Sequence, residues 1–122
     1  MKNIIGSGLR LFLLACILTA CAGQTPQSPQ VTAPAISVKI TKDNCPSIEA
    51  QADMQILWTN NDTVDLVLLI EHKDENGAVT EAGGTDLLQP ETTFSISSLA
   101  PGEYTYYCTK DHTAFGTITI TQ

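Results

Sequence analysis

Apolar and polar residues alternate in short stretches along the chain after residue 35, which predicts β-strands that each bury one face. The alternation is clearest in Ile36-Ser-Val-Lys-Ile40 and Thr93-Phe-Ser-Ile-Ser97, whereas Leu66-Val-Leu-Leu-Ile-Glu71 is a continuous apolar run of strand length. Further strands are expected at residues 47–51, 54–60, 78–81, 104–109 and 115–121. This part of the sequence shows no helical periodicity of useful length. The pattern therefore predicts an all-β fold, an antiparallel β-sandwich of seven or eight strands.

Turn residues separate these strands. Asn76-Gly77 is typical of a tight hairpin turn, Gly83–Pro90 is expected to be a loop, and Pro101-Gly102 begins another turn. A sandwich of this length buries only a small core, so a covalent cross-link would contribute noticeably to its stability.

The first 20 residues have the pattern of an export signal. Lys2 and Arg10 are basic, and Leu11–Leu18 is an apolar run too short to span a bilayer. The segment Leu18-Thr-Ala-Cys21 resembles the lipobox of bacterial lipoproteins. That resemblance implies that residues 1–20 are a lipoprotein signal peptide and that Cys21, acylated with chains such as palmitate, becomes the lipid anchor. The alternative is an ordinary secretory signal that leaves Cys21 as a free thiol.

Residues 21–35 are rich in Pro, Gln, Ser and Thr, a composition that does not fold by itself. We therefore expect a lipidated cysteine with a flexible tether at 21–35 and one domain at 36–122. The expected location is the cell envelope, outside the cytoplasm and anchored to the membrane. Ala22 is not the aspartate that marks inner-membrane retention in lipoproteins, which favours the outer membrane where two membranes are present.

The charge of the chain excludes several classes of partner. Its six basic residues include Lys2 and Arg10, so four remain after export against thirteen acidic residues, a net charge of −9. Nucleic acids and anionic lipids need basic surfaces, so neither is an expected ligand. No paired nucleophile and base is visible, and we expect the protein not to be an enzyme. An envelope protein or ligand that the sequence does not identify remains the expected partner.

Two cysteines, Cys45 and Cys108, remain after the predicted signal and anchor are set aside. Disulfides persist outside the cytoplasm, so an even pair in that setting is first a candidate for a bridge. The pair alone does not exclude free thiols or a metal ligand.

Three segments of the domain resemble the cupredoxins, a family of copper-binding β-sandwich proteins. They are Pro46-Ser-Ile48 with Ile56-Leu-Trp-Thr-Asn-Asn-Asp62, then Leu88-Gln-Pro-Glu-Thr-Thr-Phe94, and last Pro101-Gly-Glu-Tyr-Thr-Tyr-Tyr-Cys108 with His112 and Gly116-Thr-Ile-Thr-Ile120. Together they extend over essentially all of residues 36–121. The resemblance implies a cupredoxin-like, Greek-key β-sandwich.

Copper in this family is held by two imidazoles, a thiolate and a weak axial ligand, often Met. The resemblance places the thiolate on Cys108 and the second imidazole on His112. The first imidazole falls on Asp65-Leu66 and the axial ligand on Phe115, so two of the four ligands are missing. His72 is expected to be a solvated residue near a hairpin turn.

The resemblance also implies that Cys45 lies close to Cys108, because the strand that starts at Pro46 begins at the copper end of such a sandwich. We therefore expect a Cys45–Cys108 disulfide in place of the metal, which excludes Cys108 as a thiolate ligand. The leading hypothesis is a metal-free, cupredoxin-like binding or structural module without a cofactor.

Two alternatives remain open. The first is a copper carrier or electron-transfer protein that uses Cys108 and His112. The second is an immunoglobulin-like adhesion module, in which Trp58 packs on a Cys45–Cys108 bridge and Tyr106 forms a tyrosine corner.

Overall fold

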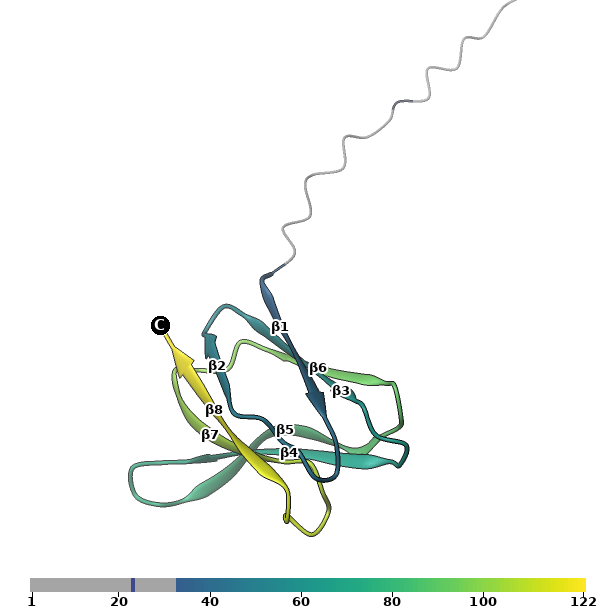
Figure 1. Ribbon diagram of the computed structural model, residues 1–122. Coiled ribbons are helices and arrows are strands. Elements are labelled where there is room, and N and C mark those ends of the chain that lie inside the picture. Colours follow the sequence, from purple (N-terminus) through teal and green to yellow (C-terminus); the bar gives the residue numbers. More distant parts are fainter. Residues whose placement is uncertain (1–22, 24–32) are drawn as a thin grey trace, which may run out of the picture. The chain divides into compact units, whose positions relative to one another are not determined.

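The structure, a computed structural model, describes Gly23 and residues 33–122. The predicted signal peptide at 1–20, Cys21 and most of the tether lie outside the described residues. Within the described part, no helix is long and apolar enough to cross a membrane. The described chain forms strands only (Figure 1), and these are β1 (Ala35–Ile40), β2 (Ile48–Gln51), β3 (Gln55–Asn60), β4 (Leu66–Lys73), β5 (Val79–Leu88), β6 (Thr93–Ser97), β7 (Gly102–Tyr107) and β8 (Phe115–Thr121).

The strands form two sheets, which confirms the predicted all-β sandwich. One sheet has the order β1-β3-β6 and the other has the order β2-β8-β7-β4-β5. The pairing is mixed rather than purely antiparallel, because β1 pairs parallel to β3 and β2 pairs parallel to β8. The reason is that β1 and β2 are consecutive in the chain but enter different sheets, so neither forms a hairpin with its neighbour in sequence.

One apolar core lies between the two sheets. Trp58 of β3 and Tyr106 of β7 meet in it with their ring centroids 5.7 Å apart, and both side chains are fully buried. Alternate residues of the strands point into the core, as the period-two pattern predicted. The remaining buried apolar residues are Val38, Ile40, Ile48, Ala50, Ile56, Leu66, Leu68, Ile70, Leu88, Tyr104, Cys108, Ile118 and Ile120.

Strand β5 corrects the prediction of a loop at Gly83–Pro90, since it continues to Leu88. Gly84 lies within this strand. The position requires glycine because a side chain there would collide with the backbone carbonyl of Leu68 in β4. The register of β4 and β5 also shifts between Leu66 and Leu68. The glycine therefore marks a close approach of two strands rather than a turn.

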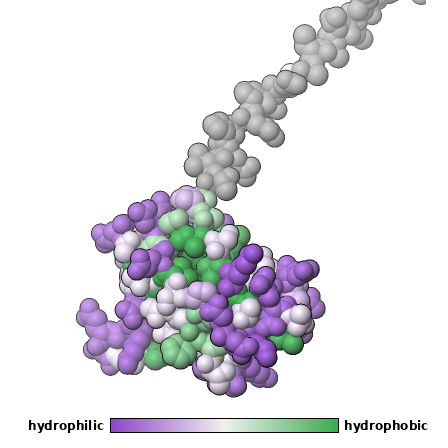
Figure 2. Space-filling view, viewed as in Figure 1, coloured by the Kyte–Doolittle hydropathy of each residue, from purple (hydrophilic) through white to green (hydrophobic). Residues whose placement is uncertain are grey.

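The edge strands of the two sheets, β1 and β2, border an open apolar groove. Apolar side chains gather on this face of the domain in Figure 2. The groove has a volume of about 490 Å³, and Ile36, Ala50 and Met54 contribute its apolar lining. Because neither edge strand has a further neighbour in its sheet, the seam between the sheets opens to solvent here.

Candidate functional site

Three loops meet at one end of the sandwich, and we call this region the cysteine end. The loops are residues 41–47 between β1 and β2, residues 61–65 between β3 and β4, and residues 108–114 between β7 and β8. A disulfide joins the first loop to the third, and a hydrogen bond joins the first to the second. Every described residue predicted to bind copper or to replace it lies in these loops or beside them.

Cys45 and Cys108 form the expected disulfide. Their Cα atoms are 6.2 Å apart although 63 positions separate them in the sequence. Cys108 is fully buried at the end of β7, whereas Cys45 is only partly buried. The bond therefore cross-links the core of the five-stranded sheet to a loop at the surface.

The loop that carries Cys45 is also held by contacts that do not involve sulfur. Thr41 and Asn44 exchange two backbone hydrogen bonds of 3.0 and 3.2 Å. The buried hydroxyl of Tyr106 donates a hydrogen bond to the carbonyl of Pro46. Beneath them, a side chain at Gly116 would lie 2.6 Å from the Cys45 carbonyl oxygen and 2.8 Å from that of Pro46. The loop thus packs directly onto β7 and β8.

Burial raises the pKa of Tyr106 to about 12, and the nearby indole N–H of Trp58 partly offsets this rise. That N–H is buried and does not reach hydrogen-bond geometry with any partner in the described part of the chain. Tyr106 consequently stays protonated near neutral pH and remains a hydrogen-bond donor to Pro46.

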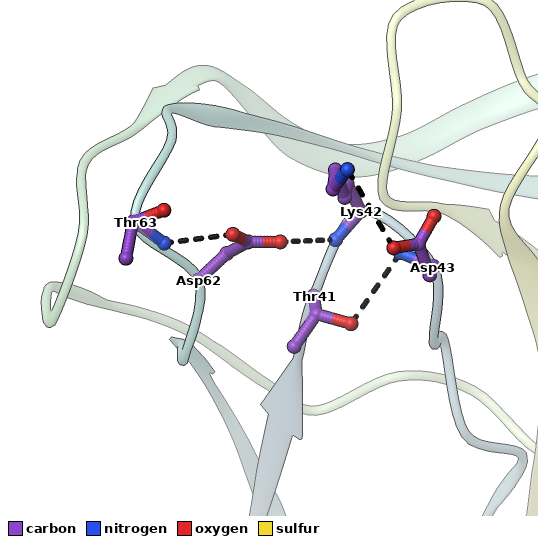
Figure 3. A network of polar contacts seen from close by, with 5 residues as sticks. All are labelled: Thr41, Lys42, Asp43, Asp62 and Thr63. Atoms are coloured by element: carbon purple, nitrogen blue, oxygen red, sulfur yellow. Dashed lines mark hydrogen bonds and ion pairs between the residues drawn. The ribbon is translucent and has the colours of Figure 1, made fainter.

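Asp62 connects the first loop to the second (Figure 3). Its carboxylate accepts hydrogen bonds from the backbone N–H groups of Lys42, at 2.9 Å, and Thr63, at 2.7 Å. These bonds favour the charged form and lower the pKa of Asp62 below its usual value of 3.8. Lys42 also pairs with Asp43, with 3.7 Å between the charged atoms, on the exposed surface.

Asn60 is the only polar residue that is fully buried in the described chain. Its side-chain amide donates to the carbonyls of Val64 and Leu88, each at 2.8 Å, and its side-chain oxygen accepts from the backbone N–H of Asp62, also at 2.8 Å. From the sequence, Asn60 was expected only as the last residue of a strand. Asn60 instead fixes the loop that presents Asp62.

The third loop has its own polar network. The hydroxyl of Thr113 donates to the Asp111 carboxylate at 2.8 Å, and the Thr109 hydroxyl accepts from the backbone N–H of Ala114 at 3.1 Å. Hydrogen bonds from Thr113 and Thr109 lower the pKa of Asp111. The backbone N–H of Cys108 also donates to the Ala114 carbonyl, at 3.0 Å, which closes the loop at its base.

His112 lies on this loop, exposed to solvent, in a left-handed backbone conformation with φ of 60°. Its imidazole stacks on the ring of Tyr107, with the centroids 4.1 Å apart. Phe115, at the predicted axial position, is 63% exposed and lies 6.3 Å from the Tyr107 ring. His112 and the strand residues on either side of the loop therefore form an aromatic surface.

His72 lies near the end of β4, beside the turn between β4 and β5, as expected, but it is half-buried, because its ring packs on Tyr104 of β7 at a centroid distance of 4.9 Å. Because Tyr104 is at the opposite end of β7 from Cys108, His72 does not belong to the cysteine end.

The described residues do not fit the copper set of four ligands. The sulfur of Cys108 is bonded to Cys45, and Leu66, at the place of the first imidazole, is buried against the core. In residues 33–122 no group of three or more His, Cys, Asp or Glu side chains could hold a metal ion. We derive no copper chemistry from this arrangement.

A cavity of about 250 Å³ adjoins Cys108. Its lining includes two basic residues, Lys42 and Lys110, and two acidic residues, Asp65 and Asp86. The formal charges of these four side chains therefore sum to zero.

The immunoglobulin-like alternative required Cys45 within a strand. The structure places Cys45 in the loop before β2, so the bridge does not join two strands across the middle of the sandwich.

Comparison with known proteins finds solved structures that are similar to this domain. No family model matches the sequence, and no curated protein matches it. The Cu(I) form of one amicyanin variant is similar to 75% of this chain and 87% of its own, with 19% sequence identity and a TM-score of 0.58. The reduced form of another variant has 18% identity over the same shares, with a TM-score of 0.58. Identity at this level shows the fold alone. The two mixed sheets and these neighbours together give the chain a cupredoxin-like fold.

Proposed function

We propose that this chain is an exported, membrane-anchored lipoprotein whose cupredoxin-like domain has lost its type 1 copper site and serves as a binding or structural module of the cell envelope. One observation carries the loss of copper. Cys108, the residue at the thiolate position, is buried in a disulfide with Cys45. A sulfur in a disulfide does not coordinate copper as a thiolate, so cross-link and thiolate site exclude each other.

The other ligand positions support this proposal. Leu66 and Phe115 have no donor atoms that bind copper, and His112 is stacked on Tyr107. The alternative of a copper carrier that uses Cys108 and His112 needs the bridge to open first. In this proposal the domain has no catalytic role.

Addition of Cu(II) to the oxidised and the reduced domain tests the loss of copper. We expect both forms to lack an intense visible thiolate-to-copper charge-transfer band. Such a band in the reduced domain would overturn the proposal, and replacement of His112 by Asn would then show whether that imidazole is a ligand.

The anchor is tested separately in cells that express the full chain. We expect labelled palmitate to be incorporated into the wild-type protein and into Cys45→Ser, but not into Cys21→Ser. Label that persists in Cys21→Ser would contradict lipidation at this residue.

Thiol titration of the denatured, unreduced protein should find no free thiol from Cys45 or Cys108.

A further inference from the structure

We propose that the outer face of β4 and β5, beside the loop at residues 108–114, binds a neutral, N-acetylated amino sugar of a glycan chain. The inference deepens the proposed function, on which it rests, by naming a ligand for the binding module. It involves neither the disulfide nor a metal.

Two hollows adjoin on this face, and we call them together the β4–β5 cleft. One is the cavity of about 250 Å³ described above, and the other has a volume of about 340 Å³. Val67, Asp86 and Lys110 line both hollows, so the two share a border. Val67 alternates with the buried Leu66 and Leu68 in β4 and therefore points away from the core. The cleft thus lies on the outer face of the five-stranded sheet.

An irregularity in the pairing of β4 with β5 shapes the cleft. Between the pairs Leu66–Leu88 and Leu68–Thr85, β5 contains one more residue than β4. A bulge of this kind bends the strand and redirects its side chains. Residues 86–87 lie on the bulge, are exposed and line the cleft.

The loop at residues 108–114 forms the facing wall, and its own hydrogen bonds fix its conformation. The Thr109 hydroxyl accepts from the backbone N–H of Thr113 at 3.1 Å. His112 lines the larger hollow while its imidazole stacks on Tyr107. A ligand therefore meets a wall that needs little ordering on binding, which keeps the entropic cost of binding low.

The two hollows differ in chemistry. The larger one is lined by polar side chains, which are Glu81, Thr85, Asp86, Lys110 and His112. The smaller one has apolar side chains in its lining, which are Val64, Leu66, Val67 and Leu87. The cleft therefore suits a ligand with a polar body and a small apolar group.

Charge selects the class of ligand. The lining of the cleft includes Lys42 and Lys110 together with the acids Asp65, Glu81 and Asp86, and the whole chain has a formal net charge of −7. An anion meets the excess of acids, and a cation meets the two lysines. A neutral saccharide avoids both forms of repulsion. Its hydroxyl groups donate to carboxylates and accept from ammonium or imidazole N–H groups, and the cleft offers both kinds of partner.

An acetamido group matches the apolar half of the cleft. With the sugar ring in the polar hollow, the methyl of that group is placed beside the apolar side chains of the smaller hollow. An extended peptide fits less well, because such peptides bind along an unpaired strand edge. Strand β4 is paired on both sides, with β5 and with β7, and offers no such edge. Recognition in the cleft therefore depends on side chains.

The test uses the full, lipidated chain with its disulfide intact, held in nanodiscs of zwitterionic lipid and titrated calorimetrically with N,N′,N″-triacetylchitotriose. We expect saturable binding at one site per chain. Asp86→Ala should weaken binding about tenfold through loss of a charged hydrogen-bond partner. Leu87→Ser should weaken it about threefold through loss of apolar contact. Both residues are exposed, so both variants should fold.

Glu103→Ala is the matched control, because it removes an exposed acid of β7 that does not line the cleft, and it should bind as the wild type does. Cellotriose has hydroxyl groups in place of the acetamido groups and should bind about tenfold more weakly. Equal affinity for the two sugars, or an equal loss in Asp86→Ala and Glu103→Ala, would overturn the site.

Absence of binding to the acetylated trisaccharide, both by calorimetry and by saturation-transfer NMR, would also overturn the proposal. Binding of a neutral, capped tripeptide in its place would assign the cleft to peptides and contradict a saccharide site. These outcomes leave the loss of the type 1 site standing, because that proposal fails only on a visible charge-transfer band with Cu(II).

Discussion

Strand β7 has a tyrosine packed against a histidine near each of its ends, and the two pairs have different roles. Near the start of the strand, Tyr104 pairs in register with His72 of β4 and donates a hydrogen bond of 2.8 Å to the Ala100 carbonyl. Near the other end, Tyr107 stacks on His112, which belongs to a loop and is exposed. The first pair is embedded in the sheet, whereas the second lies at the surface of the cysteine end.

The two ends of the domain are therefore stabilised differently, one by strand pairing and the other by cross-links between loops. The His72 end is held by the ladder between β4 and β7. The cysteine end is held by a disulfide, by Asn60 and by carboxylate contacts to backbone N–H groups. Substitutions at the His72 end should therefore affect stability through packing within the sheet. Substitutions at the cysteine end should affect it through the disulfide and the hydrogen bonds of the loops.

The largest effect is expected from loss of the disulfide. In Cys45→Ala with Cys108→Ala, the loop of 63 positions is no longer closed in the unfolded chain, which costs up to about 4 kcal/mol in the free energy of unfolding. Urea denaturation followed by Trp58 fluorescence measures it. The reduced wild type is the control and should lose a similar amount. An unchanged urea midpoint would show that the bond does not stabilise the fold.

The next effect compares two glycines. Gly116→Ala pushes a methyl group to 2.6 Å from the Cys45 carbonyl and should cost about 2–3 kcal/mol through overpacking. Gly77→Ala, in the β4–β5 turn, meets only the end of Lys73 at 3.6 Å and should cost about 1 kcal/mol from its φ of +83°. Urea midpoints of both variants check the order. Equal losses of unfolding free energy in the two variants would show that the Cys45 loop moves aside for the added methyl group at little cost.

The two histidines give a smaller contrast. His72→Ala uncovers one face of buried Tyr104 and should lower the unfolding free energy by about 1 kcal/mol. His112→Asn removes a surface stack but keeps a residue that tolerates the left-handed backbone, so its effect should stay within about 0.5 kcal/mol. Thermal and urea unfolding of both variants test this. A larger loss in His112→Asn would make the loop a structural element.

The smallest effect concerns pH. The folded-state pKa of Asp62 is lowered, so its contribution to stability is present in full above the unfolded value of 3.8 and is lost as pH falls through the folded value. Asp62→Asn should therefore be less stable than the wild type near pH 6, and the two urea midpoints should converge once the pH has fallen below the folded-state pKa of Asp62. Asp111 is present in both proteins, so its contribution to the pH dependence cancels when the two are compared. If the urea midpoints of the two proteins differed by the same amount at every pH, the titration of Asp62 would not contribute to the loss of stability in acid.

Much of the fold could be predicted because alternation is a local signal. Thr93–Ser97 was placed correctly, and the first strand differs from its prediction by one residue. The extent of β5 was missed because Gly83-Gly84 has the composition of a loop. The physical reason for Gly84 is the Leu68 carbonyl of the neighbouring strand, which no local pattern reveals.

The candidate site was predictable in part. The Cys45–Cys108 bond followed from the resemblance to cupredoxins, and the structure contains it. The hydrogen bond between Lys42 and Asp62 joins loops 20 positions apart, and their meeting depends on β1 and β3 pairing in parallel. Neither residue type signals that role by itself. The packing of His72 on Tyr104 could not be predicted, because the two residues are distant in sequence and meet only through the pairing of β4 with β7.

The position of β8 has a consequence for folding kinetics. The last strand of the chain lies between β2 and β7 (Figure 1), so the five-stranded sheet is divided until those final residues are available. The pairing of β2 with β8 joins Ile48 to Ile118, a contact of long sequence separation. Folds rich in such contacts form slowly, on the order of milliseconds to seconds. The five-stranded sheet is therefore completed only when β8 is available, and a chain that lacks β8 would leave backbone N–H and C=O groups along the facing edges of β2 and β7 unpaired.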